Sequence, residues 1–376
     1  MSSLSARVEK AARQARDANR RRRLERGEAG WGAPVLPAPV LPVGLGQPRK
    51  VVVVGAGRQG WRLAAGTKAV TGAELVGLAD LDADRLADIG GRVGLDPEKR
   101  FTDAAAMFAS GLIDLAAIAT TAPHHIALAR QAKDAGISRI LIEKPIDNDY
   151  GEAAKFVAEC EADGTLLAVN HSRRWTPDHR SIVAAIHAGQ LGDVKIITAQ
   201  TGAGELAMLG SHHIDFCRMV LRSEPVGVSA QLREREGGNQ RGSQYEDPTG
   251  HLTVTFASGA RAFIDFTDDL DRNNSVVTIR GQEGMIVVEE SHETWTMRSA
   301  SGRQWVFPFA DQFRPAPMSA RVMGGVLTES VPASSGRDGL AALEVVLAAL
   351  HSNADGGRVV NLPLTPEQLA LPTRFA

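Results

Sequence analysis

The chain has 376 residues, of which 43% are hydrophobic and 23% charged, and its formal net charge at pH 7 is -2. This length predicts two domains plus an appendage, and the near-neutral charge gives no reason to expect a nucleic acid or a membrane as partner. The only two cysteines, Cys160 and Cys217, lack metal-ligand spacing, so we expect neither disulfides nor a metal site. The sequence has no run long enough for a membrane helix and no secretory signal pattern, which predicts a cytoplasmic protein.

The first 48 residues are predicted to form an arm. Residues 1 to about 30 have the pattern of one basic helix with a thin apolar stripe, and prolines dominate residues 33–43. Because proline fixes φ and lacks an N–H donor, we expect the second part to be an extended tether. Such an arm has little core of its own, so it either docks on a neighbouring subunit or stays a solvated tail.

From residue 49 to 170, short apolar or β-branched runs alternate with alanine-rich stretches of helical periodicity. This alternation predicts βα units and a doubly wound parallel sheet. The runs expected to be strands cover residues 51–54, 74–79, 112–119, 139–142 and 166–169.

Residues 171–376 carry longer runs in which apolar and polar residues alternate between turn signals. We therefore expect an α+β domain with a large, mostly antiparallel sheet, which makes the whole chain an α/β protein. Helices are expected at 211–221 and at about 338–352. The expected strands cover residues 194–200, 251–256, 260–266, 275–280 and 285–288.

A glycine-rich turn joins the first expected strand to a helix that begins near Arg58. In dinucleotide-binding folds the first glycine of such a turn permits the bend, the second admits the pyrophosphate and the third lets helix and strand pack closely. This context favours a Rossmann domain over residues 49–170, although a glycine turn without a ligand has the same spacing. The expected cofactor contacts are Gly55, Gly57, Arg58, Gln59 and Gly60.

Asp80 ends the second expected strand and is the acidic residue expected downstream of the glycine turn. Its carboxylate would accept hydrogen bonds from the adenosine ribose hydroxyls and repel a 2′-phosphate, which favours NAD over NADP. Arg58 is close enough in sequence to keep NADP open, and a surface aspartate that starts a turn is the plainer alternative.

Two further motifs complete a family resemblance. Glu-Lys-Pro at 143–145 follows the strand that ends at Ile142, and Gly-x-His-x-x-Asp occupies 210–215. With the glycine turn, these motifs make residues 50 to about 365 resemble the glucose-fructose oxidoreductase / inositol dehydrogenase / MocA-type (Gfo/Idh/MocA) family. The resemblance implies an NAD-binding Rossmann domain followed by a domain that binds substrate and forms a homodimer or homotetramer.

The resemblance also assigns catalytic roles. Lys144 is expected beside the nicotinamide and the substrate hydroxyl, where it polarises or deprotonates that hydroxyl, and Glu143 is expected at the cofactor. His212 matches the family histidine that contacts the reacting hydroxyl. The adjacent His213 is the competing candidate.

Other residues match the family less specifically. Thr120 and His125 are expected near the cofactor, and Asn170 and Arg174 near the substrate, where Asp215 orients the site. For each, a helix cap or an interdomain salt bridge is an equally open alternative.

One position departs from the family. Many members carry an aspartate four residues before the histidine, where this chain has Met208. Either Lys144 and His212 handle the proton without it, or Glu205 reaches in from the loop.

The leading hypothesis is an NAD-dependent oxidoreductase that transfers a hydride between a carbinol carbon of a sugar or cyclitol and the nicotinamide. Two alternatives stay open. One is a redox-neutral glycosidase or lyase that retains NAD, and the other is a non-catalytic protein that senses NAD or sugar.

Overall fold

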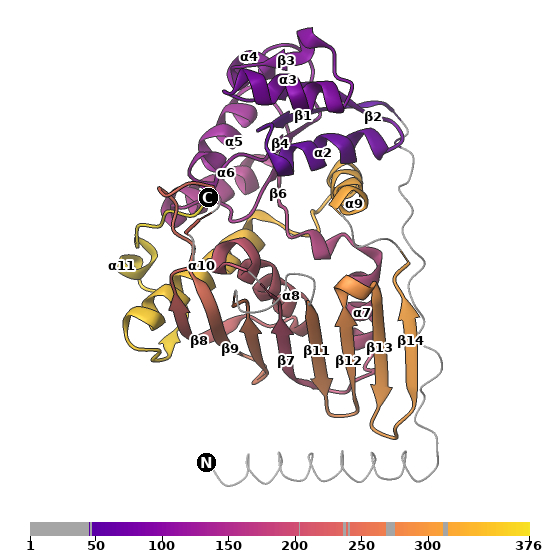
Figure 1. Ribbon diagram of the computed structural model, residues 1–376, viewed down its shortest axis with the longest axis vertical. Helices are drawn as coiled ribbons and strands as arrows, with labels where there is room; N and C mark the ends of the chain where they lie inside the picture. Colours follow the sequence, from indigo (N-terminus) through magenta and orange to yellow (C-terminus); the bar gives the residue numbers. More distant parts are fainter. Residues whose placement is uncertain are drawn as a thin grey trace.

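A computed structural model describes residues 45, 47–202, 204–235, 238–239, 241–267, 275–310 and 315–376. The expected N-terminal helix and tether lie outside these residues. Two sheets dominate the fold: a six-stranded sheet in the first half of the chain and a nine-stranded sheet in the second (Figure 1). Among the described residues, no helix is both long and apolar enough to cross a membrane.

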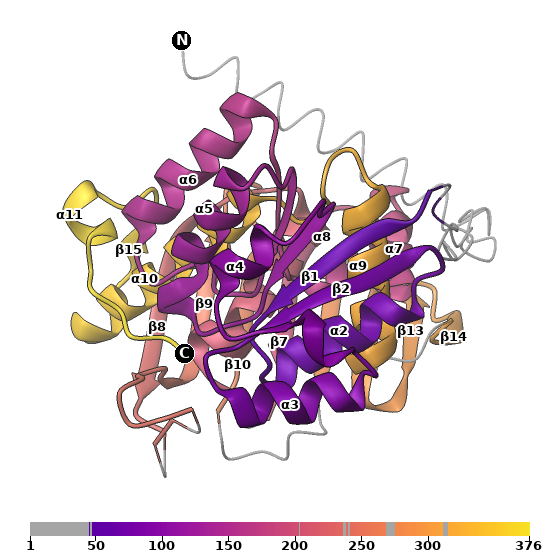
Figure 2. The ribbon, with the colours of Figure 1, turned by 90° about the horizontal axis from the view of Figure 1, so that it is seen from above.

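The first sheet is entirely parallel and has the strand order β3-β2-β1-β4-β5-β6, the order of a dinucleotide-binding Rossmann fold. Figure 2 shows α2 and α3 on one side of it and α4, α5 and α6 on the other. Its strands are β1 Arg49–Val54, β2 Ala73–Ala79, β3 Arg100–Phe101, β4 Leu115–Ile118, β5 Arg139–Ile142 and β6 Leu166–Val169. Its helices are α2 Arg58–Ala69, α3 Ala83–Arg92, α4 Ala104–Phe108, α5 His125–Asp134 and α6 Tyr150–Asp163.

The second sheet has the order β14-β13-β12-β11-β7-β10-β9-β8-β15, and only the β7–β10 pair is parallel. Its strands are β7 Val194–Gln200, β8 Pro225–Arg233, β9 Thr249–Phe256, β10 Arg261–Asp265, β11 Val276–Gly281, β12 Gly284–Glu289, β13 Thr294–Ser299, β14 Gln304–Pro308 and β15 Val360–Asn361. The remaining helices are α7 Pro177–His187, α8 Ser211–Leu221, α9 Pro315–Thr328, α10 Gly336–Ala354 and α11 Pro366–Leu369. A π-helical turn, Leu206–Gly210, leads into α8.

The sequence predicted both sheets and their pairing type. The expected strands at 139–142, 166–169 and 194–200 and the helix at 211–221 are confirmed with the same bounds. The strand expected at 112–119 is shorter, because Leu112 is 85% exposed and the Asp114 carboxylate binds the guanidinium of Arg49 and the N–H of Lys50. The sequence pattern did not predict the strands β3, β8, β13, β14 and β15 or the helices α7, α9 and α11.

Helix α9 comes late in the chain, yet it covers the Rossmann sheet beside α2 (Figure 1). Its residues Val322, Met323 and Val326 are buried in the same apolar cluster as Val51 and Leu63 of the first domain. The close approach depends on Gly66 in α2, where an added Cβ would lie 2.7 Å from the carbonyl carbon of Ser319. One face of the N-terminal core is therefore completed from the C-terminal half.

Candidate active site

The glycine turn lies at the carboxyl end of β1, as expected. Gly55 has φ +98°, and a Cβ on it would approach the Ala119 carbonyl oxygen to 2.6 Å, so only glycine fits there. A Cβ on Gly60 would collide with the carbonyl oxygen of Gly55 at 1.6 Å, which shows how closely α2 packs on the turn. A Cβ on Gly57, in contrast, would meet no atom within 4 Å, so the backbone faces open space.

Asp80 lies at the end of β2 and is tied to the glycine turn. Its Oδ2 accepts the N–H of Ala56 at 2.6 Å, and its Oδ1 accepts the N–H of Asp82 at 2.9 Å. Arg85 lies 3.8 Å from Oδ2, whereas Arg58 is exposed at the start of α2. The carboxylate is thus held at the edge of the sheet, and its remaining lone pairs can accept hydrogen bonds from ribose hydroxyls.

Glu143 connects the first turn of α2 to the loop after β6 at the same edge of the sheet. Its Oε1 accepts a hydrogen bond from Gln59 Nε2 at 3.2 Å and one from Asn170 Nδ2 at 2.6 Å. Glu143 and Asn170 are both buried, and the side-chain oxygen of Asn170 has no hydrogen-bond partner. A buried acceptor without a partner is costly, so Asn170 is well suited to receive a donor from a ligand.

His125 is fully buried and ties two loops together. One ring nitrogen lies 2.9 Å from the Pro145 carbonyl and the other 3.2 Å from the Thr120 carbonyl. Burial lowers the pKa of His125 below its usual range. As placed, His125 positions the Thr120 loop and the Glu-Lys-Pro loop, and it would act on a cofactor only through them.

Lys144 is buried, and its Nζ donates to the carbonyl oxygen of Met208 at 2.6 Å. Desolvation lowers the pKa of Lys144 to about 8, against the opposing attraction of Glu143. This contact joins the Rossmann domain to the π-helical turn that precedes α8. It brings Lys144 to the part of the chain that carries His212.

The two neighbouring histidines have different surroundings. His212 is partly exposed, its Nδ1 is buried without a partner, and burial together with repulsion from Lys144 holds its pKa well below the usual range. His213 is completely buried, and burial together with repulsion from Arg173 lowers its pKa to about 3. The structure therefore brings His212, rather than His213, toward Lys144.

Arg174 and Asp215 bind each other. The Nε and Nη2 atoms of Arg174 donate to the two oxygens of Asp215 at 2.8 and 2.7 Å, and Asp215 has no exposed surface. Arg174 also reaches Asp338 at the start of α10. The pair is a salt bridge within the second domain, and the expected role of both residues near the substrate stays a prediction.

Two family models together match more than half of the chain. One, described as an oxidoreductase family with an NAD-binding Rossmann fold, matches residues 49–171, and the other, a GFO/IDH/MocA C-terminal domain, matches residues 195–287. The chain belongs to the Gfo/Idh/MocA oxidoreductase family. The resemblance inferred from the three motifs is thereby confirmed.

This Gfo/Idh/MocA chain is 28% identical to inositol 2-dehydrogenase 3 of Saccharopolyspora erythraea over 79% of its own length and 90% of that protein. It is 37% identical to a D-apiose dehydrogenase of Paraburkholderia graminis, but that match covers only 33% of this chain and 32% of the relative. An inositol dehydrogenase homolog of Azotobacter vinelandii, solved with NADH and myo-inositol, has the same fold, with a TM-score of 0.74 and 16% identity over 86% of this chain and all of that one.

The N-terminal domain is the NAD-binding domain of this oxidoreductase, and its residues fit the cofactor. The first N–H groups of α2 have no side-chain cap, and the open side of Gly57 leaves them accessible to a pyrophosphate. Asp80, whose Oδ2 accepts the N–H of Ala56 in the same turn, stays the residue predicted to bind the adenosine ribose. Gln59 donates to Glu143, and the adjacent Lys144 contacts the turn that leads into α8.

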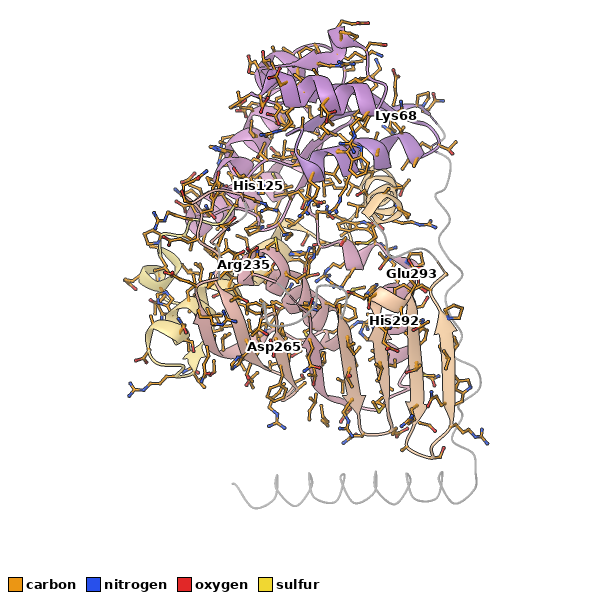
Figure 3. All side chains as sticks on the ribbon, in the orientation of Figure 1. Lys68, His125, Arg235, Asp265, His292 and Glu293 are labelled. Carbon is orange, nitrogen blue, oxygen red and sulfur yellow. The ribbon has the colours of Figure 1, made fainter. Side chains whose placement is uncertain are left out.

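Met208 stands at the position where many Gfo/Idh/MocA members carry an aspartate. Its backbone carbonyl accepts the hydrogen bond from Lys144. Glu205, the suggested replacement, is buried nearby, but its Oε1 is bound to Arg235 at 2.7 Å. Figure 3 labels Arg235 in the half of the molecule with the large sheet and His125 in the Rossmann half.

Sequence reasoning missed Asp247. This buried carboxylate accepts the N–H groups of Ala207 and Met208 at 2.8 and 2.9 Å. Its only sequence signal is an Asp-Pro pair before a strand, which is common in turns.

Proposed function

We propose that the chain is an NAD-dependent dehydrogenase that transfers a hydride between a carbinol carbon of a sugar, cyclitol or sugar-derived substrate and the nicotinamide. The observation that carries this proposal is the buried Lys144, whose Nζ lies 2.6 Å from the carbonyl oxygen of Met208 in the turn that leads directly into the helix of His212. Burial lowers the pKa of both Lys144 and His212. Such a pair can exchange the proton of a substrate hydroxyl near neutral pH.

Each residue has a role in this proposal. Lys144, with a pKa of about 8, takes the hydroxyl proton when it is the neutral amine. His212 stays neutral and orients the same hydroxyl through a ring nitrogen. Asn170 offers its unpartnered oxygen to a neighbouring hydroxyl of the substrate. When bound, NAD supplies the ring carbon that accepts the hydride.

The substrate class rests on the relatives. Proteins named inositol and D-apiose dehydrogenases are similar to this chain, and polyols share the vicinal hydroxyls that Asn170 and His212 could bind. We therefore assign a polyhydroxylated substrate and leave the particular sugar or cyclitol to a substrate screen.

The first experiment follows reduced nicotinamide by its absorbance while a panel of sugars and cyclitols is offered with NAD. With the best substrate, Lys144→Ala and His212→Ala should each lower turnover by roughly a hundredfold or more and leave NAD affinity nearly unchanged. His213→Ala is the matched control and should be milder in its effect on turnover.

Full turnover in Lys144→Ala or in His212→Ala would remove that residue from the mechanism. Release of a cleaved sugar without any net change in reduced nicotinamide would instead identify the redox-neutral glycosidase or lyase.

A further inference from the structure

The start of the π-helical turn Leu206–Gly210 is capped from a distant part of the chain. The N–H of Leu206 donates to the Pro248 carbonyl at 2.8 Å, and the next two N–H groups, of Ala207 and Met208, donate to the two oxygens of Asp247. Helix starts leave such donors without intrahelical partners. Two consecutive residues just before β9 therefore hold three consecutive donors of this turn.

The same turn holds Lys144. Met208 donates its N–H to Asp247 Oδ2 at 2.9 Å and accepts Lys144 Nζ on its carbonyl at 2.6 Å. Only one residue thus separates the carboxylate from the ammonium. A shift of Asp247 would move the Met208 carbonyl and, with it, the contact that fixes Lys144.

Several charged groups share this buried region. Burial raises the pKa of Asp247 to about 7, with repulsion from Glu205 acting in the same direction and Lys144 in the opposite one. Around Lys144, the carboxylates of Glu143, Asp247 and Glu205 favour the ammonium and Arg241 disfavours it. The carboxylate of Asp247 is therefore one of the charges that act on the Lys144 ammonium, and it is the one that also holds Met208.

We propose that Asp247 is a positioning residue for Lys144, which holds the Met208 carbonyl against the ammonium and adds its own negative charge to the surroundings of that ammonium. The inference rests on the proposed function for its catalytic meaning, since Lys144 is the proton acceptor there. A helix cap alone would only stabilise the fold, whereas a positioning residue of the proposed kind also changes the pKa of Lys144.

Charge and geometry can be separated with two variants. Asp247→Asn removes the negative charge, so the pKa of Lys144 should fall below the value of about 8 in the unmodified protein. Asp247→Glu keeps the charge but lengthens the side chain, so the pKa should stay near 8 while turnover falls. The matched control is Glu246→Gln, which removes an exposed carboxylate that pairs with Arg374 rather than with the turn.

The first measurement does not depend on activity. In protein labelled with ¹³C at lysine Cε, the Lys144 signal is assigned with Lys144→Arg and followed by NMR as the pH rises. We expect the midpoint to move down by roughly half a unit or more in Asp247→Asn and to stay in place in Glu246→Gln. An unchanged midpoint in Asp247→Asn would reduce Asp247 to a helix cap and overturn the proposal.

The second measurement is the pH profile of turnover with NAD and the best polyol. Oxidation needs neutral Lys144, so turnover should rise with pH through about 8 in the unmodified protein and through a lower pH in Asp247→Asn. The turnover plateau of that variant should fall roughly tenfold or more because the lysine is misplaced. If no polyol is oxidised but the NMR midpoint still shifts, the proposed function fails while the link between Asp247 and Lys144 stands.

Discussion

At the scale of single residues, Asp80 is the side chain that we expect to set the preference between NAD and NADP. Its carboxylate accepts the N–H of Ala56, so it is oriented by the same turn that admits the pyrophosphate. Arg85, 3.8 Å away, and the exposed Arg58 are the cations that a 2′-phosphate could use. We expect the balance between this carboxylate and the two arginines to decide between NAD and NADP.

We expect NAD to bind more tightly than NADP because Asp80 repels a 2′-phosphate. Asp80→Ser should narrow the difference in Kd, measured by fluorescence titration with both cofactors. Asp82→Ser is the control, since it removes a neighbouring charge while serine can still cap α3. Equal or tighter NADP binding by the unmodified protein would show that the arginines outweigh Asp80.

At the scale of elements, α9 is the helix whose position matters most for the Rossmann domain. Met323 of this helix is completely buried and packs into the apolar cluster of the first domain. Burial of that side chain across a sequence distance of more than 200 residues links the two halves of the chain.

Met323→Ala should lower the free energy of unfolding by about 2–5 kcal/mol. The substitution removes a buried side chain and leaves a cavity between α9 and the first domain. Leu112→Ala removes a side chain that is 85% exposed and should change stability by no more than about 0.5 kcal/mol. Denaturant titration of both variants measures the difference. A loss in Met323→Ala as small as in the control would mean that α9 contributes little to the core.

At the scale of the whole molecule, one face of the large sheet carries an uncharged row. Pairing in register places Phe263, Thr198, Thr278, Val287 and then Thr296 and Val306 side by side across six strands. Phe263 is 40% exposed and Val306 60%, while the alternate residues of the same strands face the core. Aromatic side chains such as that of Phe263 are enriched where subunits meet, and an exposed face without charges is compatible with such a contact.

We expect the protein to be a homodimer or homotetramer that pairs through this row. Phe263→Asp should shift the mass measured by light scattering toward the monomer, because it places a charge within the contact. Val331→Asp alters an exposed apolar residue between α9 and α10 and should leave the mass unchanged. An unaltered mass in Phe263→Asp would exclude this face as the contact.

Local pattern predicted the βα units of the Rossmann domain and five of the strands of the large sheet. The bounds of strands β5, β6 and β7 and of helix α8 agree with those expected from the sequence. In each of these strands the residues that become buried are apolar residues of the pattern. The glycine turn and Asp80 also follow from spacing along a βα unit. Lys144 and His212 were identified by motif, and the motif alone left His213 open.

Tertiary structure decided what depends on contacts between distant residues. The rotation of α8 turns His213 into the interior and leaves His212 near Lys144, and both histidines look alike in the sequence. Strand β8 owes its place to eight pairings with β9, and α9 to a cluster formed mainly by the first domain. Asp247 meets Met208 across 39 residues. No local periodicity encodes such contacts, because they exist only once both sheets are packed together.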